Sequence, residues 1–223
     1  MRIRSKPWAR PELAACPYFT ENPVEFKGSW RKHFARPEQP LHIELGCGKG
    51  GFMAQLAPSQ PDINFMALDI KFEMLGVARR KIAAAYEQGS IAADNILLVK
   101  TNIESIIPIF SAEDSVSRIY INFCNPWQKA PDKKHRLTYP RQLMKYREFL
   151  CDGGEIRFKT DNDGLFEDSL GYFEECGFEI EYLTRDLHSS DFAGNIMTEH
   201  ELMFSAEGIP IKMLIARKGT ISL

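Results

Sequence analysis

The chain has 223 residues, of which 44% are hydrophobic and 26% are charged, a composition typical of a globular protein with one sizeable core. The formal net charge is −2 at pH 7, so affinity for nucleic acid has to come from local basic patches. The five cysteines are scattered and do not cluster with histidines, which argues against a disulfide framework and against a metal site. No apolar run is long enough to cross a membrane, and we expect a cytoplasmic protein without membrane partners.

Strand and helix patterns alternate along most of the chain. Residues 1–40 contain many prolines, show little periodicity and are expected to form an arm or lid. After them the sequence predicts strands at 41–45, 63–70, 95–102, 117–124 and 155–161, and helices at 51–59, 71–89, 139–150 and 163–177, the third of these stopped by Gly153 and Gly154. Two last strands, at 178–187 and 209–218, have only a long polar loop between them. This order predicts an α/β fold with a mostly parallel sheet, helices on both faces and a terminal antiparallel hairpin.

A glycine-rich turn follows the first strand. Gly46, Gly48 and Gly51 match the pattern G-x-G-x-x-G, and Asp69 ends the next strand about twenty residues later, where a carboxylate can accept from ribose hydroxyls. The pattern alone does not separate a dinucleotide from another adenosyl ligand. Glu44 favours S-adenosylmethionine, because a carboxylate there would repel a pyrophosphate but suits an ammonium and a sulfonium. Asn102, after the third strand, is either an adenine contact or a turn residue.

The fourth strand runs into "NPW", with Lys129 just beyond. A proline cannot donate to a strand ladder, so the strand has to stop there. The fourth strand of such a sheet lies beside the first, and Asn125 is therefore expected to face the donor methyl group. We expect Pro126 to hold the turn rigid and Trp127 to anchor it in the core, although a plain strand-ending turn is the alternative.

The segments "HIELGCGKGGF", "IYINFCNPWQKAPDKKHRLTYPRQL", "FKTDN" and "NIMTEHELMFSAEGIPIKML" resemble those of bacterial tRNA (guanine-N7-)-methyltransferases, over about residues 40 to 217. The resemblance implies a Rossmann-like class I methyltransferase, a three-layer sandwich with a seven-stranded sheet in residues 37–223 after an N-terminal arm, 1–36. It also implies methyl transfer from S-adenosylmethionine to N7 of a guanine in the variable loop of tRNA, by a monomer or homodimer.

The resemblance also implies roles for individual residues. Donor contacts are implied for Glu44, Asp69, Asn102 and Asn125, with Gly46 and Gly48 in the donor loop and Asn125 also catalytic. Substrate contacts are implied for Lys129, Asp161, Thr198 and Glu201. From the sequence alone, Asp161 is equally suited to cap the following helix, and "TEHE" is a capping-box pattern.

Several residues depart from the family pattern. Asn125 stands where aspartate is usual, Gln128 where proline is usual, and His200 where tyrosine is usual. Asn125 keeps a carbonyl acceptor but lacks the negative charge of aspartate. An RNA-binding paralogue with little turnover is therefore an alternative interpretation of the chain. An exocyclic-amine methyltransferase is a further alternative, and a dinucleotide oxidoreductase is disfavoured by Glu44.

Basic residues support an RNA partner. Arg2, Arg4, Lys6 and Arg10 lie near the start of the chain. A second group occupies one stretch that is otherwise poor in acidic residues: Lys129, Lys133, Lys134, Arg136, Arg141, Lys145 and Arg147. Such clusters can track phosphates, and a solvated helix face is the alternative.

Overall fold

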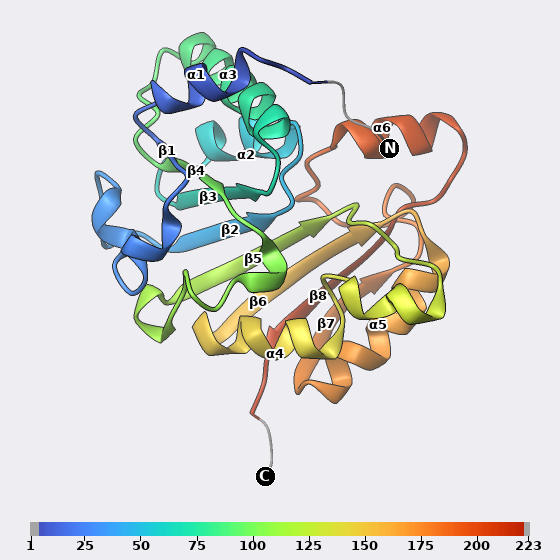
Figure 1. The fold of residues 1–223 in the computed structure, drawn as a ribbon. Coiled ribbons are helices and arrows are strands. Elements are labelled where there is room, and N and C mark those ends of the chain that lie inside the picture. The colour runs from blue at the N-terminus through green and yellow to red at the C-terminus, as the bar shows by residue number, and fades with distance from the viewer. Residues whose placement is uncertain (1–4, 221–223) are drawn as a thin grey trace. The chain divides into compact units, whose positions relative to one another are not determined.

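The computed structural model describes residues 5–220, and its contacts divide the chain into two compact units, residues 1–114 and 115–223 (Figure 1). Arg2 and Arg4, predicted to contact RNA, lie outside the described residues. Within the described part, no helix is both long enough and apolar enough to cross a membrane.

The first unit is built on parallel strands. Strand β2 (Leu41–Leu45) pairs with β3 (Asn64–Asp69), and β3 pairs with β4 (Ile96–Lys100). A two-residue strand, β1 (Phe19–Thr20), adds to the outer side of β4 and was not predicted. All five residues of β2 are buried, as expected for a strand covered on both faces.

Three helices accompany these strands. Helix α2 (Gly51–Ser59) and helix α1 (Ala9–Ala14) both pack against α3 (Phe72–Gln88). The contact of α1 with α3 is close, because a Cβ atom at Gly76 would lie 2.6 Å from Cβ of Ala9. The described part of the expected N-terminal arm is thus packed on the first unit.

Two short 3₁₀ helices continue this packing, Pro23–Phe26 and Trp30–His33. Trp30 is fully buried and its indole Nε1 donates to the carbonyl oxygen of Ile109 at 2.6 Å. The buried carboxylate of Asp114 accepts from the backbone N–H groups of Gly28, Trp30 and Ser111. Prolines therefore break the periodicity of this segment without preventing it from folding.

The second unit combines parallel and antiparallel pairing. Strand β5 (Val116–Asn122) is parallel to β6 (Leu150–Thr160). Strand β8 (Lys212–Lys218) is antiparallel both to β6 and to β7 (Phe178–Thr184), so the predicted terminal hairpin is confirmed, and β8 lies between β6 and β7. Helices α4 (Pro140–Phe149) and α5 (Asp163–Glu175) pack against each other and against these strands (Figure 1).

Two predicted details of the second unit are wrong. Gly153 and Gly154 do not stop the preceding helix, which ends at Phe149, and they lie inside β6 instead. Gly153 has a φ of +70°, so the strand bends there in a conformation that glycine permits. The polar segment before β8 is also not only a loop, because it contains helix α6 (Glu199–Ala206).

Candidate active site

The glycine turn after β2 is tied to the end of β3. The backbone N–H groups of Gly46 and Cys47 both donate to the carbonyl oxygen of Leu68 at 2.9 Å. Gly46 and Gly48 have φ values of +77° and +53°, the left-handed region that glycine adopts most easily. A Cβ atom at either position would meet no described atom within 4 Å, so the space beside this part of the turn is open.

Gly50 is the crowded glycine of this turn, and the sequence pattern missed it. It is the N-cap residue of α2, with a φ of +72°, and a Cβ atom there would lie 2.6 Å from Cβ of Ala78 on α3. Gly51, the third glycine of the predicted pattern, is the first residue of α2. The sequence contains the signal, "GKGG", but the close approach of α3 depends on tertiary packing.

Asp69, the last residue of β3, is joined to the glycine turn. Its Oδ2 accepts from the N–H of Gly48 at 3.0 Å and its Oδ1 accepts from the N–H of Lys71 at 2.9 Å. Burial raises the pKa of Asp69 above its ordinary value, although these backbone N–H groups oppose the shift. The predicted pair of glycine turn and acid is therefore brought together in the first unit.

The surroundings of the turn are acidic. Glu44 is only 3% exposed, two residues before the first glycine. The pKa of the Cys47 thiol is raised well above its usual value, first by burial and then by the nearby carboxylates of Glu44 and Asp69. An open turn flanked by two carboxylates suits a cationic ligand and disfavours a pyrophosphate.

Asn102 follows β4 and already has a structural partner. Its side-chain oxygen accepts from the N–H of Glu104 at 3.0 Å and caps the 3₁₀ helix Ile103–Ser105. The turn role that the sequence left open is therefore present. The adenine contact remains a prediction, and the side-chain amide N–H2 of the exposed Asn102 is the donor that it would use.

In the second unit the segment after β5 makes a strained turn. The strand ends at Asn122, two residues earlier than predicted, and Phe123 has a φ of +51°. Asn125 is exposed and its Oδ1 accepts from the N–H of Trp127 at 3.1 Å. Because a carbonyl oxygen has two lone pairs, one acceptor position of Asn125 is left for a ligand.

Trp127 does not anchor this turn in the core, which corrects the expectation from the sequence. Its side chain is 37% exposed, and its ring lies against the imidazole of His135 with the ring centroids 5.3 Å apart. Its φ is +40°, which is unfavourable for a bulky residue. The turn is held instead by the hydrogen bond between Asn125 and Trp127 and by Arg136 Nε, which donates to the carbonyl oxygen of Pro126 at 2.7 Å.

Lys129 and Asp161 follow the ends of β5 and β6. Lys129 is exposed and precedes the 3₁₀ helix Ala130–His135. Asp161 is half-buried, and its carbonyl oxygen accepts from Lys212 Nζ at 2.9 Å. The cap of α5 is Asn162, whose side chain accepts from the N–H of Leu165 at 2.8 Å, so the alternative role of Asp161 as a helix cap is wrong.

Thr198 and Glu201 form the capping box that the sequence suggested at the start of α6. Thr198 Oγ1 accepts from the N–H of Glu201 at 3.1 Å, and Glu201 Oε2 accepts from the N–H of Thr198 at 3.4 Å. Thr198 is 7% exposed and Glu201 is fully buried. A direct substrate contact of either residue remains a prediction, and this geometry provides a structural role for both.

Glu201 is also the centre of a buried polar network that was not predicted from the sequence. Its Oε2 accepts from Lys159 Nζ at 2.8 Å, and its Oε1 bonds to His188 Nε2 at 2.8 Å and accepts from Asn195 Nδ2. Burial raises the pKa of Glu201, but Lys159 and the hydrogen bonds outweigh burial and hold this pKa below its ordinary value. A lysine near the end of the apolar strand "IRFK" is the only signal for this network in the sequence.

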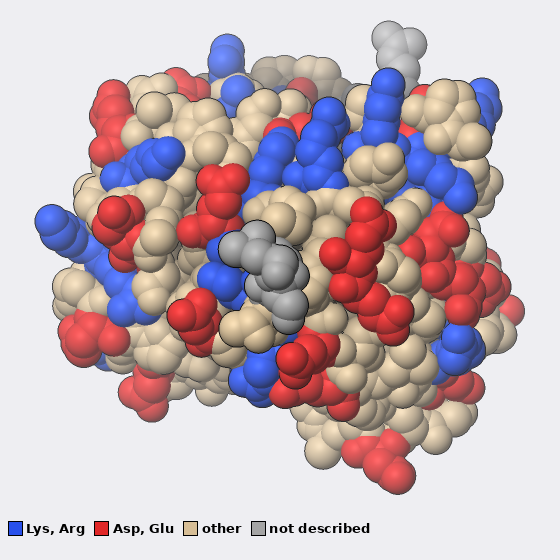
Figure 2. Space-filling view, turned by 90° about the horizontal axis from the view of Figure 1, so that it is seen from below, with Lys and Arg blue, Asp and Glu red and all other residues tan. Residues whose placement is uncertain are grey.

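The basic stretch divides into structural and exposed residues. Arg136 is 3% exposed, and both it and Lys133 pair with Asp168 on α5. Arg147 donates to the carbonyl oxygens of Gly177 and Gly219. The predicted phosphate contacts therefore fall mainly to Lys129, Lys134 and Arg141, which are exposed. Figure 2 shows one face, on which basic side chains gather in the upper part of the view.

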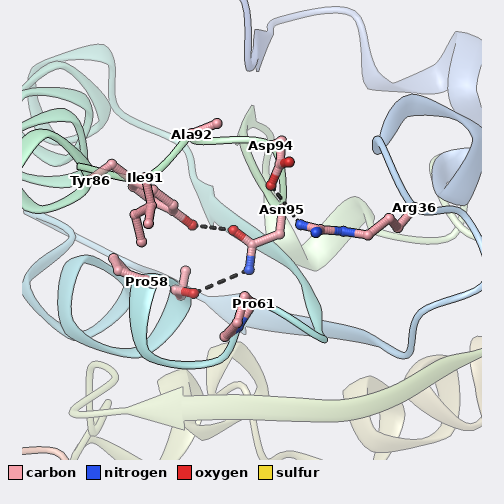
Figure 3. A pocket seen from close by; sticks show the side chains of 9 residues that line it. Arg36, Pro58, Pro61, Tyr86, Ile91, Ala92, Asp94 and Asn95 are labelled. Carbon is pink, nitrogen blue, oxygen red and sulfur yellow. Dashed lines mark hydrogen bonds and ion pairs between the residues drawn. The ribbon is translucent and has the colours of Figure 1, made fainter. Parts of the chain in front are cut away.

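A pocket of about 250 Å³ in the first unit lies away from the glycine turn (Figure 3). Pro58, Pro61, Asp94 and Asn95 line it and precede β3 and β4, whereas the glycine turn and Asp69 lie at the opposite ends of the strands. Asn95 Nδ2 donates to the carbonyl oxygens of Ala57, Gln60 and Ile63, at 3.1, 3.2 and 2.9 Å. These hydrogen bonds join the segment that precedes β4 to the segment that precedes β3. The amide of Asn95 in the pocket therefore has a structural role.

Known proteins similar to this chain are methyltransferases. The family model described as "Putative methyltransferase" matches residues 38–214. A tRNA (guanine-N(7)-)-methyltransferase of Clostridium perfringens is 58% identical over 98% of this chain and 100% of its own length. Another from Clostridium beijerinckii is 57% identical over 98% of this chain and 99% of its own.

Solved structures with little sequence identity share the fold. The 16S rRNA methyltransferase KamB is 12% identical and aligns over 85% of this chain and 91% of its own, with a TM-score of 0.63. A precorrin-6y C5,15-methyltransferase from Geobacter metallireducens is 12% identical, covers 85% of each chain and has a TM-score of 0.55. The predicted class I methyltransferase fold is confirmed, and the chain belongs to the tRNA (guanine-N7-)-methyltransferase family.

Proposed function

We propose that this chain transfers the methyl group of S-adenosylmethionine to N7 of a guanine in the variable loop of tRNA. The observation that carries the proposal is the open glycine turn hydrogen-bonded to Asp69 and flanked by Glu44. Such a turn fits a donor that combines ribose hydroxyls with cationic groups. Family membership supplies the substrate class, and a tRNA substrate implies action in the cytoplasm.

The donor supplies an electrophilic methyl group, and the chain has to hold it and align the acceptor. We assign Asp69 to the ribose hydroxyls, Glu44 to the cationic end of the donor, and Gly46 and Gly48 to close backbone approach. Asn102 is assigned to the adenine edge. Because guanine N7 carries a free lone pair, no general base is needed, and positioning supplies much of the rate.

Asn125 is assigned to this positioning. Pro126 and the hydrogen bond from the N–H of Trp127 hold its side chain in one orientation. Lys129 and Asp161, which follow neighbouring strands, are assigned to the RNA, Lys129 to a phosphate or the O6 edge and Asp161 to the N1–H and N2 amine of guanine. Thr198 and Glu201 complete the predicted substrate contacts, with α6 as their scaffold.

Substitutions of Asn125 test this positioning. Asn125→Ala removes both the acceptor and the bond that fixes the turn, and we expect single-turnover methyl transfer to unmodified tRNA to fall at least about tenfold. Asn125→Asp keeps an acceptor that can bond the N–H of Trp127, and we expect only a modest change. The measurement is the rate of formation of N7-methylguanine by the three proteins.

The same assay separates the alternatives. An inert parent protein together with an active Asn125→Asp variant would identify an RNA-binding paralogue. Methylation of an exocyclic amine instead of N7 would identify the other class of enzyme. If Asn125→Ala is as fast as the parent, the turn has no part in positioning.

Salt dependence tests the RNA contacts. Changing Lys134 and Arg141 to alanine is expected to weaken tRNA binding and to reduce the slope of log K against log salt by about 0.7–0.9 for each phosphate that is no longer neutralised. Donor affinity should stay the same. Arg185→Ala is a matched control, because Arg185 is also exposed but pairs with Glu167. Equal slopes for the parent and the double variant would mean that these residues form only a solvated surface.

The oligomeric state, monomer or homodimer, stays a prediction. Sedimentation of the full chain with and without tRNA measures it directly.

A further inference from the structure

The conformation and the exposure of Trp127 both raise the free energy of the folded protein. A bulky residue with a φ of +40° lies in the left-handed backbone region, which stores strain. The side chain is also 37% exposed, so a large apolar ring is left partly in water. Strain of this kind persists where the surrounding structure enforces it, and it concentrates at sites that bind ligands.

The surrounding structure does enforce this conformation. Asn125 Oδ1 holds the N–H of Trp127, and Arg136 Nε holds the carbonyl oxygen of Pro126. Arg136 is itself buried and pairs with Asp168, which also binds Lys133. The turn is therefore fixed internally by Asn125 and is tied to α5 through Arg136 and Asp168, which holds the indole in a defined position.

One neighbouring ring lies tilted against the indole. The imidazole of His135 lies at a centroid distance of 5.3 Å and an interplanar angle of 48°. Lys129 and Lys134 are exposed on the adjoining 3₁₀ segment. An exposed aromatic ring among cationic side chains is the combination that binds a base by stacking and its phosphates by charge.

We propose that the target guanine stacks on the exposed face of Trp127, and that the indole stabilises the positive charge that methylation creates on the base. This inference rests on the proposed function. The N7 lone pair forms the new bond to the methyl carbon, and the electrons of the broken carbon–sulfur bond stay on sulfur. The positive charge therefore moves from the sulfonium to the guanine ring, and no proton is transferred.

This charge movement makes the indole more than a surface for binding. The face of an indole attracts cations, so it interacts more strongly with the methylated base than with the neutral one. Because only interactions that strengthen towards the transition state accelerate the chemical step, stacking on Trp127 raises the rate as well as the affinity.

Two variants that keep an apolar side chain, one with and one without an aromatic ring, test the proposal. Trp127→Leu removes the π system, and we expect the single-turnover rate with saturating tRNA and donor to fall about tenfold. Trp127→Phe keeps an aromatic face and should stay within about threefold of the parent. Tyr172→Leu is the control, because Tyr172 is a half-buried aromatic residue of the second unit that packs on the ring of Tyr139.

Binding of the product provides a readout that a purely structural role does not move. We expect Trp127→Leu to weaken binding of N7-methylated tRNA more than binding of unmodified tRNA, each measured with S-adenosylhomocysteine present. Trp127→Phe should preserve most of this difference. A variant that only disturbs the turn would weaken both tRNAs equally.

Three results would overturn the proposal: a parent-like rate for Trp127→Leu, equal losses for the leucine and phenylalanine variants, or an equal loss for Tyr172→Leu. Failure of the proposed function is distinguishable, because the parent protein itself would then form no N7-methylguanine in tRNA.

Discussion

Replacing Glu201 by alanine is expected to lower the free energy of unfolding by about 3–5 kcal/mol, the cost of leaving one partner of a buried ion pair uncompensated. Glu201 is fully buried and the side chain of Lys159 is 5% exposed, so water cannot replace the missing carboxylate. The substitution also removes one hydrogen-bond partner each from His188 and Asn195, and one half of the capping box of α6. Urea unfolding of the purified variant measures the change in stability.

Further variants separate the effect of the unpaired buried charge from the other effects of Glu201→Ala. Lys159→Met combined with Glu201→Gln removes both charges at similar volume, and we expect this pair to recover part of the stability. Glu174→Ala, a surface change on α5, should stay within about 0.5 kcal/mol of the parent. If Glu201→Ala is as stable as the Glu174→Ala control, the network around Glu201 contributes nothing to the free energy of unfolding.

Acid should weaken the same network. The pKa of Glu201 is lower in the folded protein than in the unfolded chain, so its contribution is present above the unfolded pKa and is lost as the pH falls through the folded pKa. The parent is therefore expected to lose more stability on acidification than Glu201→Gln does. Kinetics add a second distinction, since a direct substrate contact would raise the KM for tRNA even where the variant is fully folded.

Asp69→Ala is expected to weaken binding of S-adenosylmethionine by about 1.5–3 kcal/mol, the value of hydrogen bonds to a charged acceptor. The same carboxylate holds the N–H of Gly48, so its loss also releases the glycine turn. Asp69→Asn keeps one side-chain acceptor and should give an intermediate affinity. Calorimetry measures both variants, and an affinity equal to that of the parent would remove Asp69 from the donor site.

The pH dependence of donor binding follows from the same residue. Burial raises the pKa of Asp69, and only the ionised carboxylate accepts from ribose hydroxyls with both oxygens. Donor affinity is therefore expected to fall as the pH drops through this raised pKa, starting at a higher pH than for an ordinary aspartate. Asp69→Asn should show a flatter profile. NAD is not expected to bind, because the ionised carboxylate of Glu44 would repel its pyrophosphate.

The sequence by itself determined the order of the main strands and helices and the donor end of the site. Strands β2 and β3 are continuous apolar runs, and α3 carries a long helical pattern, so local propensity and burial agree in these elements. The glycine turn and Asp69 were predictable because parallel strands bring their carboxyl ends to one edge of a sheet. The motifs in the second half of the chain determined the family.

Only the tertiary structure decided which polar residues are already engaged by other parts of the protein. Arg136 and Lys134 look alike in the sequence, yet Arg136 is buried beside Asp168 and Lys134 is exposed. Glu201 gains Lys159 as a partner from a strand 42 positions away, and Trp127 lies against His135 instead of entering the core. The physical reason is that pairing and burial of polar groups depend on long-range contacts, which local patterns in a sequence do not specify.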